Sequence, residues 1–115
     1  MLIRSQDKRL IVNFDNICTV SAFPEKDSED IYVEDGTGSL MVGRYSTKEK
    51  AMKVLDMIQE AYVDYQTTHT VSNGLATMSL FVDCSDETNE LYMKVQNALG
   101  KVTVFQMPED SEVEV

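Results

Sequence analysis

Residues 46–65 constrain the fold more than any other part of the chain. Their apolar side chains recur at intervals of three and four positions, which is the period of one face of an α-helix. Ser46 and Glu49 stand at the spacing of a capping box, in which each side chain bonds an unpaired amide at the helix start. The apolar stripe comprises Ala51, Val54, Leu55, Ile58, Ala61, Tyr62 and Tyr65. We therefore predict a helix whose striped face packs on a β-sheet.

The chain before this helix has the pattern of β-strands separated by turns. Asp15 and Asn16 offer one turn, and the glycines of "DGTG" (35–38) offer another. We predict two hairpins that together form a four-stranded antiparallel meander. The predicted strands are 9–14, 17–23, 31–34 and 39–45.

The C-terminal half predicts a further hairpin, a second helix and a last strand. Asn73–Gly74 is a dipeptide that favours a two-residue hairpin turn. Ser85 or Asp86 can begin a helix, and Gly100 is placed to end it. Residues 101–107 then have the pattern of a strand, which Pro108 stops.

These segments together predict an α+β fold. It consists of an antiparallel β-sheet, with the N-terminal four-stranded meander plus later strands, packed by one long amphipathic helix and a second shorter helix. A chain of 115 residues suits one domain, which we assign to residues 1–108. Four of the seven residues in 109–115 are acidic, so we expect an acidic, flexible tail.

The charge and the apolar pattern of the chain limit its partners and its location. Twenty acidic and ten basic residues give a net charge of −10, which opposes direct binding to nucleic acid and to anionic membranes. No apolar run approaches the roughly 20 residues that span a bilayer, and the N-terminus lacks the apolar segment of a signal peptide. Cys18 and Cys84 have no metal-binding spacing, and two free thiols suit a reducing compartment, the alternative being a disulfide between them. We expect a cytoplasmic protein.

Residue types that usually carry catalysis do not form a recognisable motif. The single histidine, His69, has no acid or cysteine at a ligand spacing. The glycines of 36–43 lack the Lys–Ser/Thr ending of a phosphate loop. No serine or cysteine stands in a known nucleophile motif. We therefore expect a protein that is not an enzyme, with no catalytic residue, no metal site and no cofactor.

The start of the predicted helix is a candidate site for an anion. Its unpaired amides and the basic residues around it favour a phosphate, a nucleotide or a carboxylate. The alternative is that the lysines are only solvated, with Glu49 and Lys53 paired one turn apart. The predicted site comprises Arg44, Ser46, Thr47 and Lys48, with Lys50 and Lys53 nearby.

The outer face of the same helix is a candidate surface for a partner protein. Asp56, Glu60 and Asp64 recur every four residues, and like charges at this spacing cost roughly 0.2–0.5 kcal/mol per pair. With Glu109 and Asp110 of the tail, they could engage a basic protein surface or imitate the phosphates of nucleic acid. The alternative is an ordinary solvated face.

Three blocks of the chain, "MLIRSQDK", "YSTKEKAMKVLDMIQEAY" and "VFQMPEDSEVEV", resemble a group of small proteins encoded by phages and prophages of Gram-positive bacteria. The resemblance leaves 66–100 as the variable section and assigns no residue a role, because the group has no settled activity. It implies the context of accessory phage proteins, which often bind host components. Some proteins of this kind block a CRISPR effector, and others form oligomers that sequester cyclic nucleotide signals.

Three functions are therefore considered. The lead hypothesis is a non-enzymatic phage-encoded binding protein for counter-defence, which neutralises a host protein through its acidic surface. The second is an oligomeric module that sequesters an anionic nucleotide immune signal, of the cyclic nucleotide or cyclic ADP-ribose type, at the helix start. The third is a self-associating structural or regulatory phage protein, because an exposed sheet edge and the methionines beside the stripe are compatible with a homodimer or higher oligomer.

Overall fold

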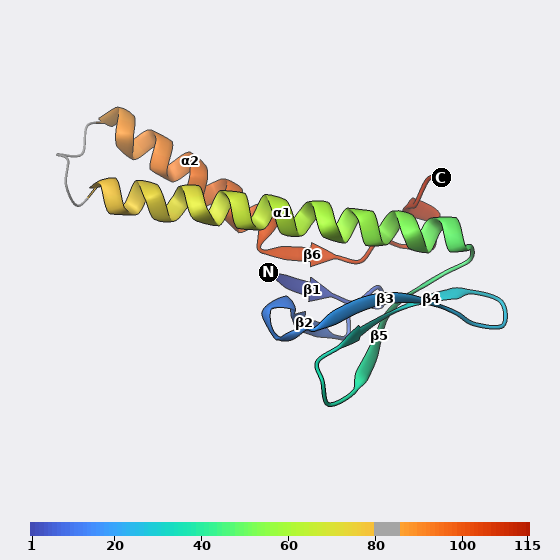
Figure 1. Ribbon diagram of the computed structural model, residues 1–115. Coiled ribbons are helices and arrows are strands. Elements are labelled where there is room, and N and C mark those ends of the chain that lie inside the picture. The colour runs from blue at the N-terminus through green and yellow to red at the C-terminus, as the bar shows by residue number, and fades with distance from the viewer. Residues whose placement is uncertain (80–85) are drawn as a thin grey trace.

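The computed structural model describes residues 1–79 and 86–115 of the chain. Among the described residues, five strands precede the two helices, and a sixth strand follows them in the same sheet as the first strand (Figure 1). In chain order, the elements of these two ranges are β1 (Leu2–Arg4), β2 (Ile11–Asn13), the 3₁₀ helix η1 (Phe14–Asn16), β3 (Thr19–Pro24), β4 (Glu29–Glu34), β5 (Ser39–Tyr45), α1 (Lys48–Ser79), α2 (Asp86–Val102), β6 (Val104–Gln106) and the 3₁₀ helix η2 (Asp110–Glu112).

The strands form two three-stranded sheets rather than one larger sheet. In the first, β1 lies between β2, which is antiparallel to it, and β6, which is parallel to it. In the second, β4 lies between β3 and β5, and both pairs are antiparallel. The predicted α+β class, with mainly antiparallel pairing and two helices, is confirmed.

The predicted four-stranded meander is wrong in its first hairpin. Strand β2 pairs with β1, so that Ile3 lies opposite Val12, and β3 pairs only with β4. The side chains of Ile3 and Val12 are both buried, so this strand pair contributes to the hydrophobic core. The predicted turn at Asp15–Asn16 lies in η1, which redirects the chain from one sheet to the other.

The second predicted hairpin is confirmed as β4 and β5. Its turn is held by the carboxylate of Asp35, which accepts hydrogen bonds from the amides of Thr37 at 2.9 Å and Gly38 at 3.2 Å. Gly36 adopts a φ of +92°, a conformation that glycine reaches without a steric penalty. A local sequence signal therefore suffices to define this hairpin.

Helix α1 begins one residue later than the capping box predicts. The hydroxyl of Thr47 accepts a hydrogen bond from the amide of Lys50 at 3.2 Å, and the carbonyl of Thr47 accepts one from Ala51 at 3.2 Å. Thr47 is therefore the N-cap. The predicted Ser46–Glu49 capping box is wrong, because the Ser46 hydroxyl donates to Asp110 instead.

The predicted hairpin at Asn73–Gly74 is also wrong, because α1 continues through both residues to Ser79. Helix α2 packs along this part of α1, and the side chain of Gln96 donates to the hydroxyl of the buried Ser72. Packing between two helices therefore outweighs a local turn preference. Residue Gly100 likewise lies inside α2, which ends at Val102, rather than after its end.

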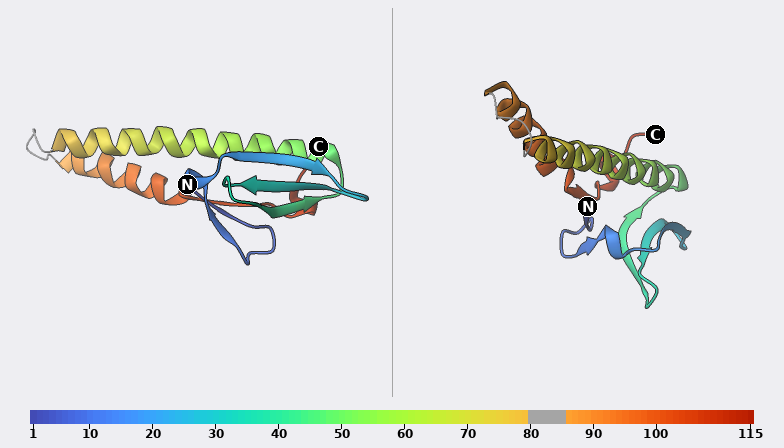
Figure 2. Two further views of the ribbon diagram at one scale, coloured as in Figure 1. Left: turned by 60° about the horizontal axis from the view of Figure 1, so that its bottom comes forward. Right: turned by 60° about the vertical axis from the view of Figure 1, so that its left-hand side comes forward.

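The two helices form an arm that extends beyond both sheets (Figures 1 and 2). The molecule measures 61 × 33 × 21 Å, and its radius of gyration is 17.5 Å. A compact domain of this length has a radius of gyration of about 13 Å. The protein is therefore elongated, and much of the arm surface does not contact a sheet.

The core lies where the N-terminal half of α1 meets the sheets. Ala51, Val54 and Ile58 are buried, and the other stripe residues pack against them, so the predicted apolar stripe is confirmed. Burial of a side chain such as that of Ile58 contributes roughly 1.5–3 kcal/mol. The remaining buried apolar residues are Met1, Ile3, Val12, Ile31, Val33, Val42, Tyr45, Met107 and Val113.

The C-terminal segment differs from the flexible tail that we expected for 109–115. It forms η2, and Val113 is buried in the core cluster with an exposed fraction of 4%. Its acidic residues are thus carried on an ordered segment beside the start of α1. Within the described ranges, no helix is both long enough and apolar enough to cross a membrane.

Candidate functional site

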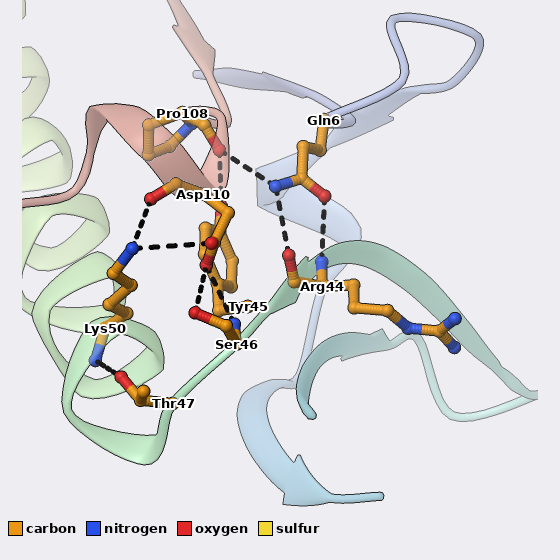
Figure 3. A network of polar contacts seen from close by, with 8 residues as sticks. All are labelled: Gln6, Arg44, Tyr45, Ser46, Thr47, Lys50, Pro108 and Asp110. Carbon is orange, nitrogen blue, oxygen red and sulfur yellow. Dashed lines mark hydrogen bonds and ion pairs between the residues drawn. The ribbon is translucent and has the colours of Figure 1, made fainter. Parts of the chain in front are cut away.

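Asp110 connects the C-terminal segment to the start of α1 (Figure 3). One carboxylate oxygen accepts hydrogen bonds from the Ser46 amide at 2.8 Å and from the Ser46 hydroxyl at 3.0 Å. The ammonium group of Lys50 donates to the other carboxylate oxygen at 3.3 Å and to the Asp110 carbonyl at 2.8 Å. The Ser46 amide is the main cause of a lowered pKa for Asp110. The place predicted for an external anion is therefore occupied by a carboxylate of the same chain.

The four residues predicted for the anion site are not brought together. Ser46 bonds Asp110, and Thr47 caps α1. Lys48 is exposed at the first position of α1. The guanidinium of Arg44 points away from Lys50 and Asp110, as Figure 3 shows. Each of the four thus has a separate environment.

Arg44 is held by a buried carboxylate on the neighbouring strand. Its Nε and Nη2 donate to the two oxygens of Asp30, both at 3.0 Å, and the Ser28 hydroxyl donates to Asp30 at 3.0 Å. The Asp30 side chain is fully buried, whereas that of Arg44 is 61% exposed. The Arg44 guanidinium is the main cause of a lowered pKa for Asp30. This ion pair joins β4 to β5 and fixes the direction of the Arg44 side chain.

Gln6 connects three parts of the chain that are distant in sequence. Its side-chain amide donates to the carbonyls of Arg44 at 3.1 Å and Pro108 at 3.2 Å, and its oxygen accepts from the Arg44 amide at 3.0 Å. The buried hydroxyl of Tyr45 also donates to Pro108, at 2.9 Å. Burial raises the pKa of Tyr45. Sequence reasoning missed Gln6 and Tyr45 because no local motif indicates partners 38 to 102 positions away.

The acidic face, defined here as Asp56, Glu60 and Asp64, remains together on the exposed side of α1. These residues line one depression together with Lys53, Met57, Gln59 and the exposed Val63. Neither of the two ion pairs found in the described parts of the chain involves this face. Its charges are therefore free to meet a cationic surface.

The tail residues predicted for the same surface are divided between two roles. Asp110 is engaged with Ser46 and Lys50. The amide of Glu109, the N-cap of η2, donates a hydrogen bond to the Glu112 carboxylate at 2.9 Å. Glu114 instead lines a depression with Asp56, Glu49 and the basic residues Lys48 and Lys53, near the N-terminal end of the acidic face.

Residues that could support other chemistry are dispersed. The ring of His69 stacks on that of Tyr65, with centroids 5.7 Å apart. Cys18 is an exposed free thiol, and Cys84 lies outside the described residues. Across 1–79 and 86–115, no group of three or more His, Cys, Asp or Glu residues is placed to hold a metal ion.

Comparison of the chain with protein-family models, with curated proteins and with solved structures found no match.

Proposed function

We propose that this protein is a non-enzymatic binding protein that neutralises a basic host protein through the acidic face of α1. The observation that carries this proposal is the line of Asp56, Glu60 and Asp64, which is exposed and takes part in no ion pair among the described residues. The phage counter-defence setting, in the host cytoplasm, is taken from the resemblance of the three sequence blocks.

Two physical features favour a partner at this face over simple solvation. The three carboxylates of the face lie one turn apart along α1. Each pair of like charges at this spacing disfavours the helix by roughly 0.2–0.5 kcal/mol, and a cationic partner would relieve this repulsion. The exposed Val63 lines the same depression as Glu60 and Asp64, and the exposed Met52 lines a depression with Asp56. The charges of such a surface can steer a partner at long range, and its apolar side chains add contact area after docking.

The second hypothesis, an anionic nucleotide at the start of α1, has less support. A nucleotide phosphate at Ser46 would have to displace the Asp110 carboxylate and break its bonds to Ser46 and Lys50. The third hypothesis, self-association alone, has no specific contact in its favour. The acidic face therefore remains the preferred candidate.

Charge reversal tests the proposal. The triple variant Asp56→Lys, Glu60→Lys and Asp64→Lys should lose capture of a basic protein from a lysate of a Gram-positive host. The wild-type protein should retain that partner at low salt and release it as the ionic strength rises, because charges on an exposed face are screened.

A matched control distinguishes the loss of the acidic face from the change in net charge. Asp15, Asp27 and Glu34 are exposed acids outside α1, and their triple replacement by lysine changes the net charge by the same amount. This control should retain the partner. Equal capture by both triple variants would refute the acidic face as the binding surface.

A further inference from the structure

A groove with a volume of about 390 Å³ lies between β2 and the hairpin of β4 and β5, away from the acidic face. Its lining includes the four consecutive residues of 10–13. Successive side chains of a strand point to opposite faces of the sheet. A groove that contacts four residues in a row therefore runs along the edge of the strand rather than over one face.

The edge of β2 along this groove offers backbone groups for pairing. β2 is the outer strand of its sheet, and no other described strand pairs with its free side. The carbonyl of Leu10 accepts from Ser5, and the amide of Phe14 donates to Met1, both towards β1. Because residues that bond to a neighbour alternate in an antiparallel ladder, the backbone groups of Ile11 and Asn13 point away from β1. Such an edge is a template for one more strand.

Each side of the groove presents one large exposed apolar side chain. Ile11 on β2 is 60% exposed, and Leu40 on β5 is 50% exposed. The lining also includes the partly buried Ile17 and the buried Val33, while polar residues and one glycine make up the other half of it. Two large exposed apolar side chains on opposite sides of the groove favour an occupant that has apolar side chains of its own at some positions.

The charge at the groove favours a cationic occupant. Asp35 lines the groove, and its carboxylate is fixed by the Thr37 hydroxyl at 2.7 Å in addition to the two turn amides. These bonds lower the pKa of Asp35, so the group stays ionised. The net charge of the whole chain, −10, acts in the same direction at longer range.

We propose that this groove binds an extended apolar peptide segment of a partner protein, with a basic residue at its flank, and that the segment pairs with the free edge of β2 as an added strand. Backbone hydrogen bonds to Ile11 and Asn13 would supply affinity, and the contacts with Ile11 and Leu40 would select apolar side chains at alternate positions. This proposal is independent of the acidic face, since none of its residues lies on α1.

A random twelve-residue peptide library, selected on the immobilised full chain, provides the probe. Enriched peptides should carry apolar residues at alternate positions and a flanking lysine or arginine. An enriched peptide, once synthesised, should bind the acidic-face triple variant as well as the wild type at high ionic strength, where the difference in net charge is screened. No enrichment over a support without protein would overturn the proposal.

The backbone contact is tested at Ile11. Ile11→Pro removes the amide hydrogen that points away from β1, and proline is tolerated on edge strands. The control Ile11→Ala keeps that amide but, like the proline variant, lacks the isoleucine side chain. We expect the proline variant to bind the selected peptide about tenfold more weakly than the alanine variant, which is the effect of losing one good hydrogen bond. Equal affinity of both would overturn strand addition.

The side-chain contact is tested at Leu40, which decides the question even if the proline variant does not fold. Leu40→Asp should abolish peptide binding, whereas Phe23→Asp, at a residue 59% exposed on the same sheet but outside the groove, should not. An equal loss in both would overturn the assignment of the groove. If Leu40→Asp instead dissociates an oligomer of the unliganded protein, the occupant is a second copy of this chain and the peptide proposal fails.

Discussion

The carboxylate of Asp110 accepts hydrogen bonds from both the amide and the hydroxyl of Ser46, at 2.8 and 3.0 Å, although 64 positions separate the two residues. The contact places a negative charge at the start of α1, where the helix dipole and the unpaired amides favour an anion. Val113 follows in the core. The helix start and the C-terminal segment therefore stabilise each other.

Asp110→Ala should lower the thermal midpoint of unfolding, because it removes both bonds to Ser46 and the ion pair with Lys50. The control Glu114→Ala, at an exposed residue of the same segment, should change the midpoint little. The pKa of Asp110 is lowered from 3.8, so its contribution is fully present above that value and is lost as pH falls through the lowered pKa. Thermal scans of variant and wild type should therefore converge in acid, and a difference independent of pH would contradict this role.

Arg44→Ala should destabilise the protein by about 2 kcal/mol, because it leaves the buried Asp30 carboxylate with the Ser28 hydroxyl as its remaining partner. Arg44→Lys should fall between wild type and alanine, since an ammonium group cannot form two parallel bonds. Urea denaturation measures both, with Lys26→Ala in an exposed loop as the control. Equal stability of Arg44→Ala and the control would contradict a structural role for the pair.

Gly43→Ala should destabilise the protein by roughly 1–3 kcal/mol through crowding in the core. A Cβ at this position would lie 2.9 Å from Cε2 of Tyr45 and 3.0 Å from Cε of Met107. Gly38→Ala is the matched control, since a Cβ there meets no atom within 4 Å. Urea titration should give a lower free energy of unfolding for Gly43→Ala than for Gly38→Ala. Similar values would show that Tyr45 and Met107 shift without cost.

Gly74→Ala should stabilise the protein by roughly 0.5–1 kcal/mol, because alanine is the better helix former and a Cβ at this position meets no atom within 4 Å. In the hairpin turn that Asn73–Gly74 indicates by itself, a positive φ would make the same substitution destabilising. The sign of the change in thermal midpoint thus distinguishes a helix from a turn. A lower midpoint would contradict the extension of α1 through Gly74.

Glu60→Lys should stabilise α1 by roughly 0.5 kcal/mol, because it replaces two like-charge contacts, with Asp56 and Asp64, by attractive ones. Glu60→Gln should give part of this gain, since it only removes the repulsion. Both variants should nevertheless capture less of the basic partner. Urea denaturation and partner capture, measured on the same preparations, should show higher stability together with weaker capture. If stability and capture both increased, the result would count against a binding role for Glu60.

The elements that could be predicted from sequence are those whose signals are local. The apolar stripe from Ala51 to Tyr65 needed only its own period, and the hairpin of β4 and β5 needed only its turn residues. The acidic face followed from the stripe, because the residues opposite a buried face are exposed. These predictions depended on residues within one or two turns of each other.

Long-range contacts decided the rest. Strand β1 pairs with β2 because this pairing buries Ile3 and Val12 together. It also pairs with β6, because the two helices lead the chain back to the same sheet. Asn73–Gly74 is helical because α2 packs along α1 there. The amino-acid sequence alone determined an acidic α+β chain with one long amphipathic helix. Only the tertiary structure decided that the anion at the start of that helix is Asp110, because burial of Val113 and the bonds to Pro108 hold the C-terminal segment in place.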